Sequence, residues 1–119
     1  MKPFFIYTNN ANLYIKNINE KEEKIASNIY IYTVNIDEFD NLEIFCIDKF
    51  ARIIKISKVK NSFTQKVVGE FPSKVKHIKD LRCNDNKDYF NLVILEQSVF
   101  CSKTHNINIK KENIEKLTI

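Results

Sequence analysis

Two short segments of this sequence are apolar on both faces of the strands that they predict. Residues Leu42 to Ile47 would point Leu42, Ile44 and Cys46 to one face and Phe45 and Ile47 to the other. Residues Asn91 to Leu95 follow a similar pattern. A strand with one solvated face alternates apolar and polar residues, so a strand that is apolar on both faces has to be covered on both sides. Both segments therefore require layers of structure around them.

The composition favours strands over helices. Apolar residues make up 44% of the chain, isoleucine dominates them, and there are nine Phe and five Tyr, a mixture that is typical of β-structure. With one Gly and two Pro, the turns have to use Asn, Asp, Lys and Ser. Asn and Asp tolerate left-handed backbone conformations and can replace Gly in turns. A length of 119 residues suits one domain, so we predict a single β-rich domain over residues 1–119.

Antiparallel strands separated by polar turns are predicted along the whole chain. In 25–36 the period is two, which would put Ile29, Ile31 and Thr33 on one face. Gly69 predicts a bulge or bend in the strand that contains it. Residues 112–119 predict a short helix or a tail. The expected strands cover residues 3–8, 13–18, 25–36, 42–47, 51–57, 63–71, 75–81 and 91–103, the last with a tight connection at 96–98 and with 104–111 extending or following it.

The pattern of a strand, a short turn and a second strand recurs at residues 4–18, 42–56 and 92–103, at a spacing of roughly 40 to 50 residues. This pattern resembles the WD-repeat β-propeller superfamily, and Val67 to Lys103 match it best, with Ser98 as the small residue before the last strand. The resemblance is one of pattern, since the chain has no Trp and no Gly-His pair. It implies about two and a half blades, with blade units at 1–24, 25–71 and 72–111 and a tail at 112–119.

A small barrel or sandwich of antiparallel strands is the competing architecture. In a sandwich, the strands that are apolar on both faces would be central, and their outer face would form a binding surface. The candidate partner surface on this interpretation consists of Leu42, Ile44, Phe45, Leu92, Ile94 and Phe100.

No motif of a catalytic or metal site is present. His77 and His105 lack the spacing and the carboxylate partners of metal ligands, and a single Gly excludes a Gly-rich phosphate loop. Cys46, Cys83 and Cys101 form no C-x-x-C pair, which indicates reduced thiols in a cytoplasmic or nuclear protein. The sequence contains no run of about twenty apolar residues, so it predicts no membrane span. We therefore expect no catalytic residue, no metal, no cofactor, no membrane and no enzymatic activity.

Basic side chains form two groups in a chain of net charge +4. A basic strand with aromatic neighbours can hold RNA through phosphate contacts and base stacking. Lysines also protect edge strands from aggregation, which is the alternative interpretation. The candidate nucleic-acid contacts are Lys55, Lys58, Lys60, Lys74, Lys76, Lys79 and Arg82.

The leading hypothesis from the sequence is a non-enzymatic protein–protein interaction module that acts as a subunit of a larger assembly. The first alternative is an RNA-contacting subunit of a ribonucleoprotein complex. A steep loss of affinity for RNA with added salt would support it over the leading hypothesis. The second alternative is a viral or parasite-specific inhibitor that covers a host protein surface.

Overall fold

The structure, a computed structural model, describes residues 3–112, so nearly all of the helix or tail expected at 112–119 lies outside the described residues. The described chain is all-β, which confirms the predicted fold class, with one turn of 3₁₀ helix, η1 (Val75–His77). The strands are β1 (Phe4–Asn9), β2 (Asn12–Asn17), β3 (Glu23–Ala26), β4 (Ile29–Ile36), β5 (Leu42–Asp48), β6 (Arg52–Val59), β7 (Ser62–Glu70), β8 (Ile78–Asp85), β9 (Tyr89–Gln97) and β10 (Ser102–Lys110).

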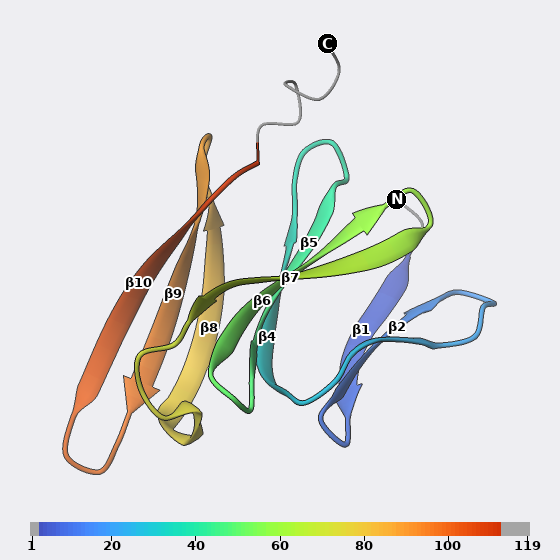
Figure 1. The fold of residues 1–119 in the computed structure, drawn as a ribbon. Helices are drawn as coiled ribbons and strands as arrows, with labels where there is room; N and C mark the ends of the chain where they lie inside the picture. Colours follow the sequence, from blue (N-terminus) through green and yellow to red (C-terminus); the bar gives the residue numbers. More distant parts are fainter. Residues whose placement is uncertain (1–2, 113–119) are drawn as a thin grey trace.

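These strands form three antiparallel sheets in chain order: a first sheet β1-β2-β3, a central sheet β4-β5-β6-β7 and a third sheet of β8, β9 and β10. The sheets cover residues 4–26, 29–70 and 78–110. The central sheet lies between the other two, and no sheet of the described chain closes into a barrel (Figure 1). The β5–β6 turn, η1 and the β9–β10 turn lie at what we call the lower end; the β4–β5 and β8–β9 turns lie at the upper end (Figure 1).

Strand β5 is buried on both faces, as its sequence predicted. Leu42, Ile44 and Cys46 belong to a first core between the first and central sheets. Phe45 and Ile47 belong to a second core between the central and third sheets. The two cores together make β5 the interior strand of the molecule, and the prediction that 42–47 is covered on both sides is confirmed.

Strand β9 is covered on one face only. The prediction that residues Asn91 to Leu95 are covered on both faces is therefore wrong for the face that carries Val93 and Leu95. Leu92 and Ile94 are buried in the second core. Val93 and Leu95 point to the opposite face of the third sheet and stay half-buried. The third sheet is at the end of the stack, and no other described sheet lies over that face (Figure 1).

A β-bulge changes the faces that the sequence predicted for β4. The pairing of β4 with β5 shifts register between Ile29 and Ile31, which leaves Tyr30 as the extra residue. Ile29 therefore joins the first core while Ile31 packs against the second, although a regular strand would put both on one face. A second shift makes Val68 the extra residue of β7, directly before Gly69, where the sequence predicted a bulge or bend.

The strand predicted at 75–81 begins later than expected. Val75–His77 form η1, and β8 starts at Ile78. A register shift between Ile78 and Asp80 makes Lys79 an extra residue, and Ile78 and Leu81 both reach the second core despite their spacing of three. The broken alternation in the sequence is the signature of this bulge.

Asn, Asp and Lys hold five of the seven left-handed turn positions in the described chain, as the composition predicted, whereas Ala11 and Ala51 hold the other two and were not expected there. The β1–β2 turn has positive φ at both central residues, Asn10 and Ala11, the geometry of a type I′ hairpin turn. Left-handed φ angles between 52° and 65° occur at Asn10, Ala11, Asn19, Asn28, Asp40, Ala51 and Lys60, and the one glycine is not among them.

Candidate binding surface

A buried carboxylate shapes the β5–β6 turn at the lower end. Asp48 is fully buried, and its Oδ1 accepts hydrogen bonds from the backbone N–H groups of Phe50 and Arg52, each at 2.9 Å. Its Oδ2 accepts a third from Arg52 Nε at 2.7 Å. The turn closes with Ala51 at φ 65°. This network presents Phe50 outward, 66% exposed, with the Arg52 guanidinium 5.5 Å from the ring centroid.

The same turn forms one wall of an open pocket, and the segment that precedes β8 forms the other. The two walls are connected by the Phe71 N–H group, which donates to the Ala51 carbonyl oxygen at 2.7 Å. Tyr30 Oη donates to the Lys76 carbonyl oxygen at 3.2 Å and holds the second wall against β4. We call this site the lower pocket; it has a volume of about 430 Å³ and is lined by Lys49, Phe50, Ala51, Ser73, Lys74, Val75 and Lys76.

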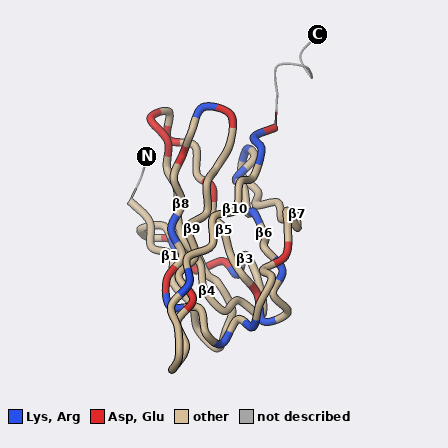
Figure 2. The backbone as a smooth tube through the Cα atoms, turned by 90° about the vertical axis from the view of Figure 1, so that its left-hand side faces the viewer, with Lys and Arg blue, Asp and Glu red and all other residues tan. Residues whose placement is uncertain are grey.

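The lower pocket carries positive charge without a compensating carboxylate. Lys49, Lys74 and Lys76 are exposed, and no carboxylate lines the pocket. Within residues 3–112 no carboxylate forms an ion pair with these three ammonium groups. Figure 2 shows blue and tan loops at the lowest end of the molecule, whereas the loops at the upper end carry both red and blue segments. The lower pocket therefore favours a negatively charged ligand.

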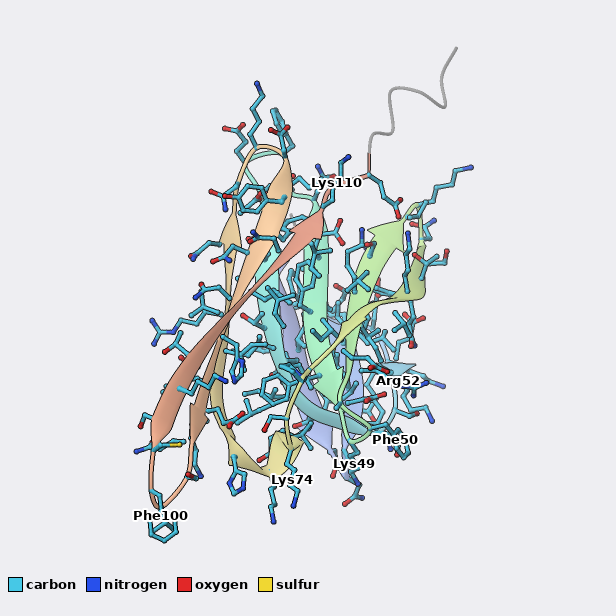
Figure 3. The ribbon with its side chains drawn as sticks, turned by 60° about the vertical axis from the view of Figure 1, so that its left-hand side comes forward. Lys49, Phe50, Arg52, Lys74, Phe100 and Lys110 are labelled. Atoms are coloured by element: carbon cyan, nitrogen blue, oxygen red, sulfur yellow. The ribbon has the colours of Figure 1, made fainter. Side chains whose placement is uncertain are left out.

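The tip of the β9–β10 hairpin is the most exposed apolar feature of the described chain. Its turn closes with the Ser98 N–H group donating to the Cys101 carbonyl oxygen at 2.8 Å, so the connection lies at 98–101 and not at the expected 96–98. Val99 is 93% exposed and Phe100 is 95% exposed. Figure 3 places Phe100 at the same end of the molecule as Lys49, Phe50 and Lys74. The lower end thus combines exposed apolar side chains with lysines.

Of the predicted partner surface, only Phe100 lies on the outside. The other five side chains are inside the two cores: Leu42, Ile44, Phe45, Leu92 and Ile94 are each no more than 6% exposed. Sequence reasoning expected a face of these strands to be open to a partner, but the first and third sheets cover both faces of β5, and the face of β9 that carries Leu92 and Ile94 packs against the central sheet. These side chains therefore stabilise the chain itself and are not available to a partner in this fold.

The predicted nucleic-acid contacts do not form one surface. Lys74 and Lys76 line the lower pocket, whereas Lys55 and Lys58 line a groove between the central and third sheets. Lys60 lies in the β6–β7 turn, apart from the lower pocket. Lys79 and Arg82 lie on β8, and Arg82 Nε pairs with Asp80 Oδ2 at 2.7 Å.

The groove between the central and third sheets has a volume of about 370 Å³ and carries both signs of charge. Lys66 Nζ pairs with Glu112 Oε1 at 2.7 Å, and this hydrogen bond lowers the pKa of Glu112. Lys111 pairs with Asp85, which also accepts a hydrogen bond from Asn35 Nδ2 at 3.1 Å. Because carboxylates neutralise its lysines, this groove is a poorer polyanion site than the lower pocket.

The histidines and cysteines form no metal cluster among the described residues. His105 lies in β10, where Nε2 is 3.2 Å from Glu96 Oε2 and the ring meets the Phe71 ring edge-on. The three cysteines are free thiols. Burial raises the pKa of Cys46 to about 12 and that of Cys83 to about 11, so neither is a reactive thiolate.

Sequence reasoning missed Lys49 and Phe50, although a local signal existed. The order Asp, any residue, Phe occurs at 37–39 and again at 48–50. In the first copy Asp37 Oδ1 accepts the N–H groups of Phe39 and Asn41 at 2.8 and 2.9 Å, the same pattern as at Asp48. Hydrogen bonds from the Asn41 side chain and backbone lower the pKa of Asp37 below its ordinary value of 3.8. Both turns expose their Phe, and that of the first copy is 77% exposed.

In the described region, no helix has the length and apolar character needed to cross a membrane. No protein-family model, no curated protein and no solved structure matches the chain. The surface chemistry of the lower end is therefore the basis for assigning a function.

Proposed function

We propose that the chain is a non-enzymatic protein–protein interaction module, a subunit of a larger assembly, that docks on its partner through the β9–β10 tip. The observation that carries this proposal is the pair Val99 and Phe100, adjacent apolar side chains that are both more than 90% exposed. Exposed apolar groups of this kind mark interaction sites, and a buried aromatic anchor is a frequent hot spot of an interface.

The hairpin that carries the tip is suited to insertion into a partner. Strands β9 and β10 pair over nine residue positions, from Ser102 opposite Gln97 to Lys110 opposite Tyr89. A continuous ladder of this length holds the tip in one orientation, so little conformational entropy is lost on docking. The partner that fits this tip has an apolar pocket of about the size of a Phe side chain.

A photo-crosslinking phenylalanine analogue in place of Phe100 is expected to capture a specific protein in cells that express the chain. The matched control carries the analogue in place of Phe39, which lies in the β4–β5 turn at the upper end and is similarly exposed. With the captured protein purified, Phe100→Ser is expected to lower its affinity for the chain by about 10- to 100-fold, because the anchor contributes roughly 1.5 to 3 kcal/mol when fully buried.

Two outcomes would contradict docking through the tip. The first is the same set of captured proteins from both positions, together with an affinity that Phe100→Ser leaves unchanged. The second is binding of the chain to vesicles of mixed neutral and anionic lipid that depends on Phe100, which would make the tip a membrane anchor.

The order of the sheets supports a propeller-like arrangement, which we propose as the finer description of the fold. Consecutive meander sheets pack face to face, as neighbouring blades do. Both outer faces of the stack carry polar groups. On the third sheet, Asn84 Nδ2 donates to Asn91 Oδ1 at 3.3 Å, and Asn91 Nδ2 donates to Asn108 Oδ1 at 2.9 Å. On the first sheet, Tyr7 Oη donates a hydrogen bond to the Glu22 carboxylate, and the Tyr7 ring stacks on that of Tyr14 with the centroids 5.6 Å apart.

Because these outer faces are compatible with water, we expect the isolated chain to be a β-rich monomer with a mass near 14.1 kDa. Light scattering after size exclusion and far-ultraviolet circular dichroism measure this directly. A stable oligomer or an aggregate would mean that another chain covers an outer face of the stack, in which case docking would involve that face and not only the tip.

A further inference from the structure

We propose that the lower pocket binds a single-stranded nucleic acid, with phosphates contacting Lys49, Lys74 and Lys76 and a base stacked on Phe50. This activity is distinct from docking through the hairpin tip and does not depend on it. It uses two of the lysines that the sequence singled out and adds Lys49, Phe50 and Arg52, which the fold brings to the same place.

The charges of the lower pocket suit a phosphate backbone. Three exposed ammonium groups line one open pocket that contains no carboxylate, and Ser73 adds a hydroxyl group that can donate a hydrogen bond. Lysine acts as a compact, mobile charge, which suits contact with successive phosphates of a flexible strand. Neutralised phosphates release their counterions, which provides sequence-independent affinity.

The aromatic ring favours a nucleic acid over an acidic peptide. Phe50 is 66% exposed and lines the lower pocket, so its ring is accessible to a base, and the Arg52 guanidinium lies 5.5 Å from the ring centroid. Bases stack on such rings regardless of sequence. A carboxylate gains nothing from the ring, because the π face carries the negative part of the ring quadrupole.

The scaffold around the pocket is preorganised. Asp48 fixes the turn that presents Lys49 and Phe50 through three hydrogen bonds, and Phe71 connects the two walls. The Lys49 N–H group also donates to the Asn28 carbonyl oxygen at 2.8 Å. A site on a rigid turn loses little entropy when a ligand binds.

Fluorescence anisotropy of the full chain with labelled oligouridine RNA and oligothymidine DNA, each of about eight nucleotides, tests the proposal. Three phosphate contacts predict a slope of about −2 in a plot of log K against log salt. Phe50→Ala is expected to weaken binding by about 5- to 100-fold. Lys74→Gln is expected to reduce the magnitude of the salt slope by about 0.7. Equal affinity for the two oligonucleotides would support recognition through phosphate and base, and tighter binding of the RNA would identify RNA as the ligand.

The matched controls are Lys110→Gln and Phe39→Ala, which make similar changes at the upper end, where Figure 3 places Lys110. Both are expected to bind as the wild type does, and thermal unfolding confirms that all variants remain folded. Retained oligonucleotide binding by Phe100→Ser would separate this site from the docking tip. The proposal is overturned if Phe50→Ala and Lys74→Gln bind as the wild type does, if the controls lose as much affinity, or if an oligoglutamate peptide binds as tightly as the RNA.

Discussion

Phe45→Ala is expected to lower the free energy of unfolding by about 3 to 5 kcal/mol, as is usual when a buried Phe is truncated. Phe45 is fully buried in the second core, and its ring centroid lies 5.0 Å from that of Phe90 on β9. The substitution leaves a cavity between the central and third sheets, removing both apolar burial and the tilted contact between the rings. Urea denaturation followed by circular dichroism measures the change.

Two further variants make this result interpretable. Phe45→Leu keeps most of the volume and is expected to cost about 1.5 kcal/mol or less, which provides a folded variant if the alanine variant does not fold. Phe39→Ala removes the same group from an exposed turn and is expected to change stability by less than about 0.5 kcal/mol. Should Phe45→Ala be as stable as the wild type, Phe45 would not be part of the second core and would again be a candidate for a partner surface.

Asp48→Ala is expected to destabilise the chain by about 3 kcal/mol. The substitution leaves the backbone N–H groups of Phe50 and Arg52 without their buried acceptor, and it removes the partner of the Arg52 guanidinium. Breaking a buried ion pair typically costs about 3 to 5 kcal/mol. We expect the lower value, since the Arg52 side chain is half exposed and water can solvate its charge.

The structure offers an internal control for this prediction. Asp37 accepts the corresponding hydrogen bonds in the β4–β5 turn from Phe39 and Asn41, but it is not fully buried. Asp37→Ala is therefore expected to cost only about 1 kcal/mol, because water can replace the lost acceptor. If urea denaturation gives the same loss of unfolding free energy for Asp48→Ala and Asp37→Ala, the burial of Asp48 does not increase its contribution to stability.

Most strand positions could be predicted from the sequence where the pattern was regular, but the single strand expected at 25–36 is wrong: β3 ends at Ala26, and β4 begins at Ile29 in another sheet, after Asn28 with its positive φ. The strand at 42–47 and the split of its side chains between two faces follow from a period of two, which depends only on neighbouring residues.

The bulges at Tyr30 and Lys79 were not predicted, because an extra residue in one strand is defined by the strand that pairs with it; the broken alternation at 75–81 indicated an irregular strand but not which residue is extra. The length of β9 was not predicted for a related reason. Glu96 was expected in the turn, but its pairing with Lys103 on β10 keeps it in the strand.

The candidate site could be predicted only in part. Lys74 and Lys76 were expected to contact a polyanion. Lys49 and Phe50 belong to the β5–β6 turn, far from those lysines in the sequence, and the hydrogen bond from the Phe71 N–H group to the Ala51 carbonyl oxygen brings the two segments together. It also could not be predicted that Lys55 and Lys58 line the groove between the central and third sheets and not the lower pocket.

The amino-acid sequence by itself determined that this protein is all-β, that its turns use Asn and Asp, and that its fifth strand is interior, since these properties depend on local alternation and local backbone preferences. Only the tertiary structure decided that β9 has one open face, that five predicted partner residues are core, and that the lower end combines lysines with exposed Phe. These depend on which distant segments cover or adjoin one another, and residue patterns along a single strand carry no information about its neighbours.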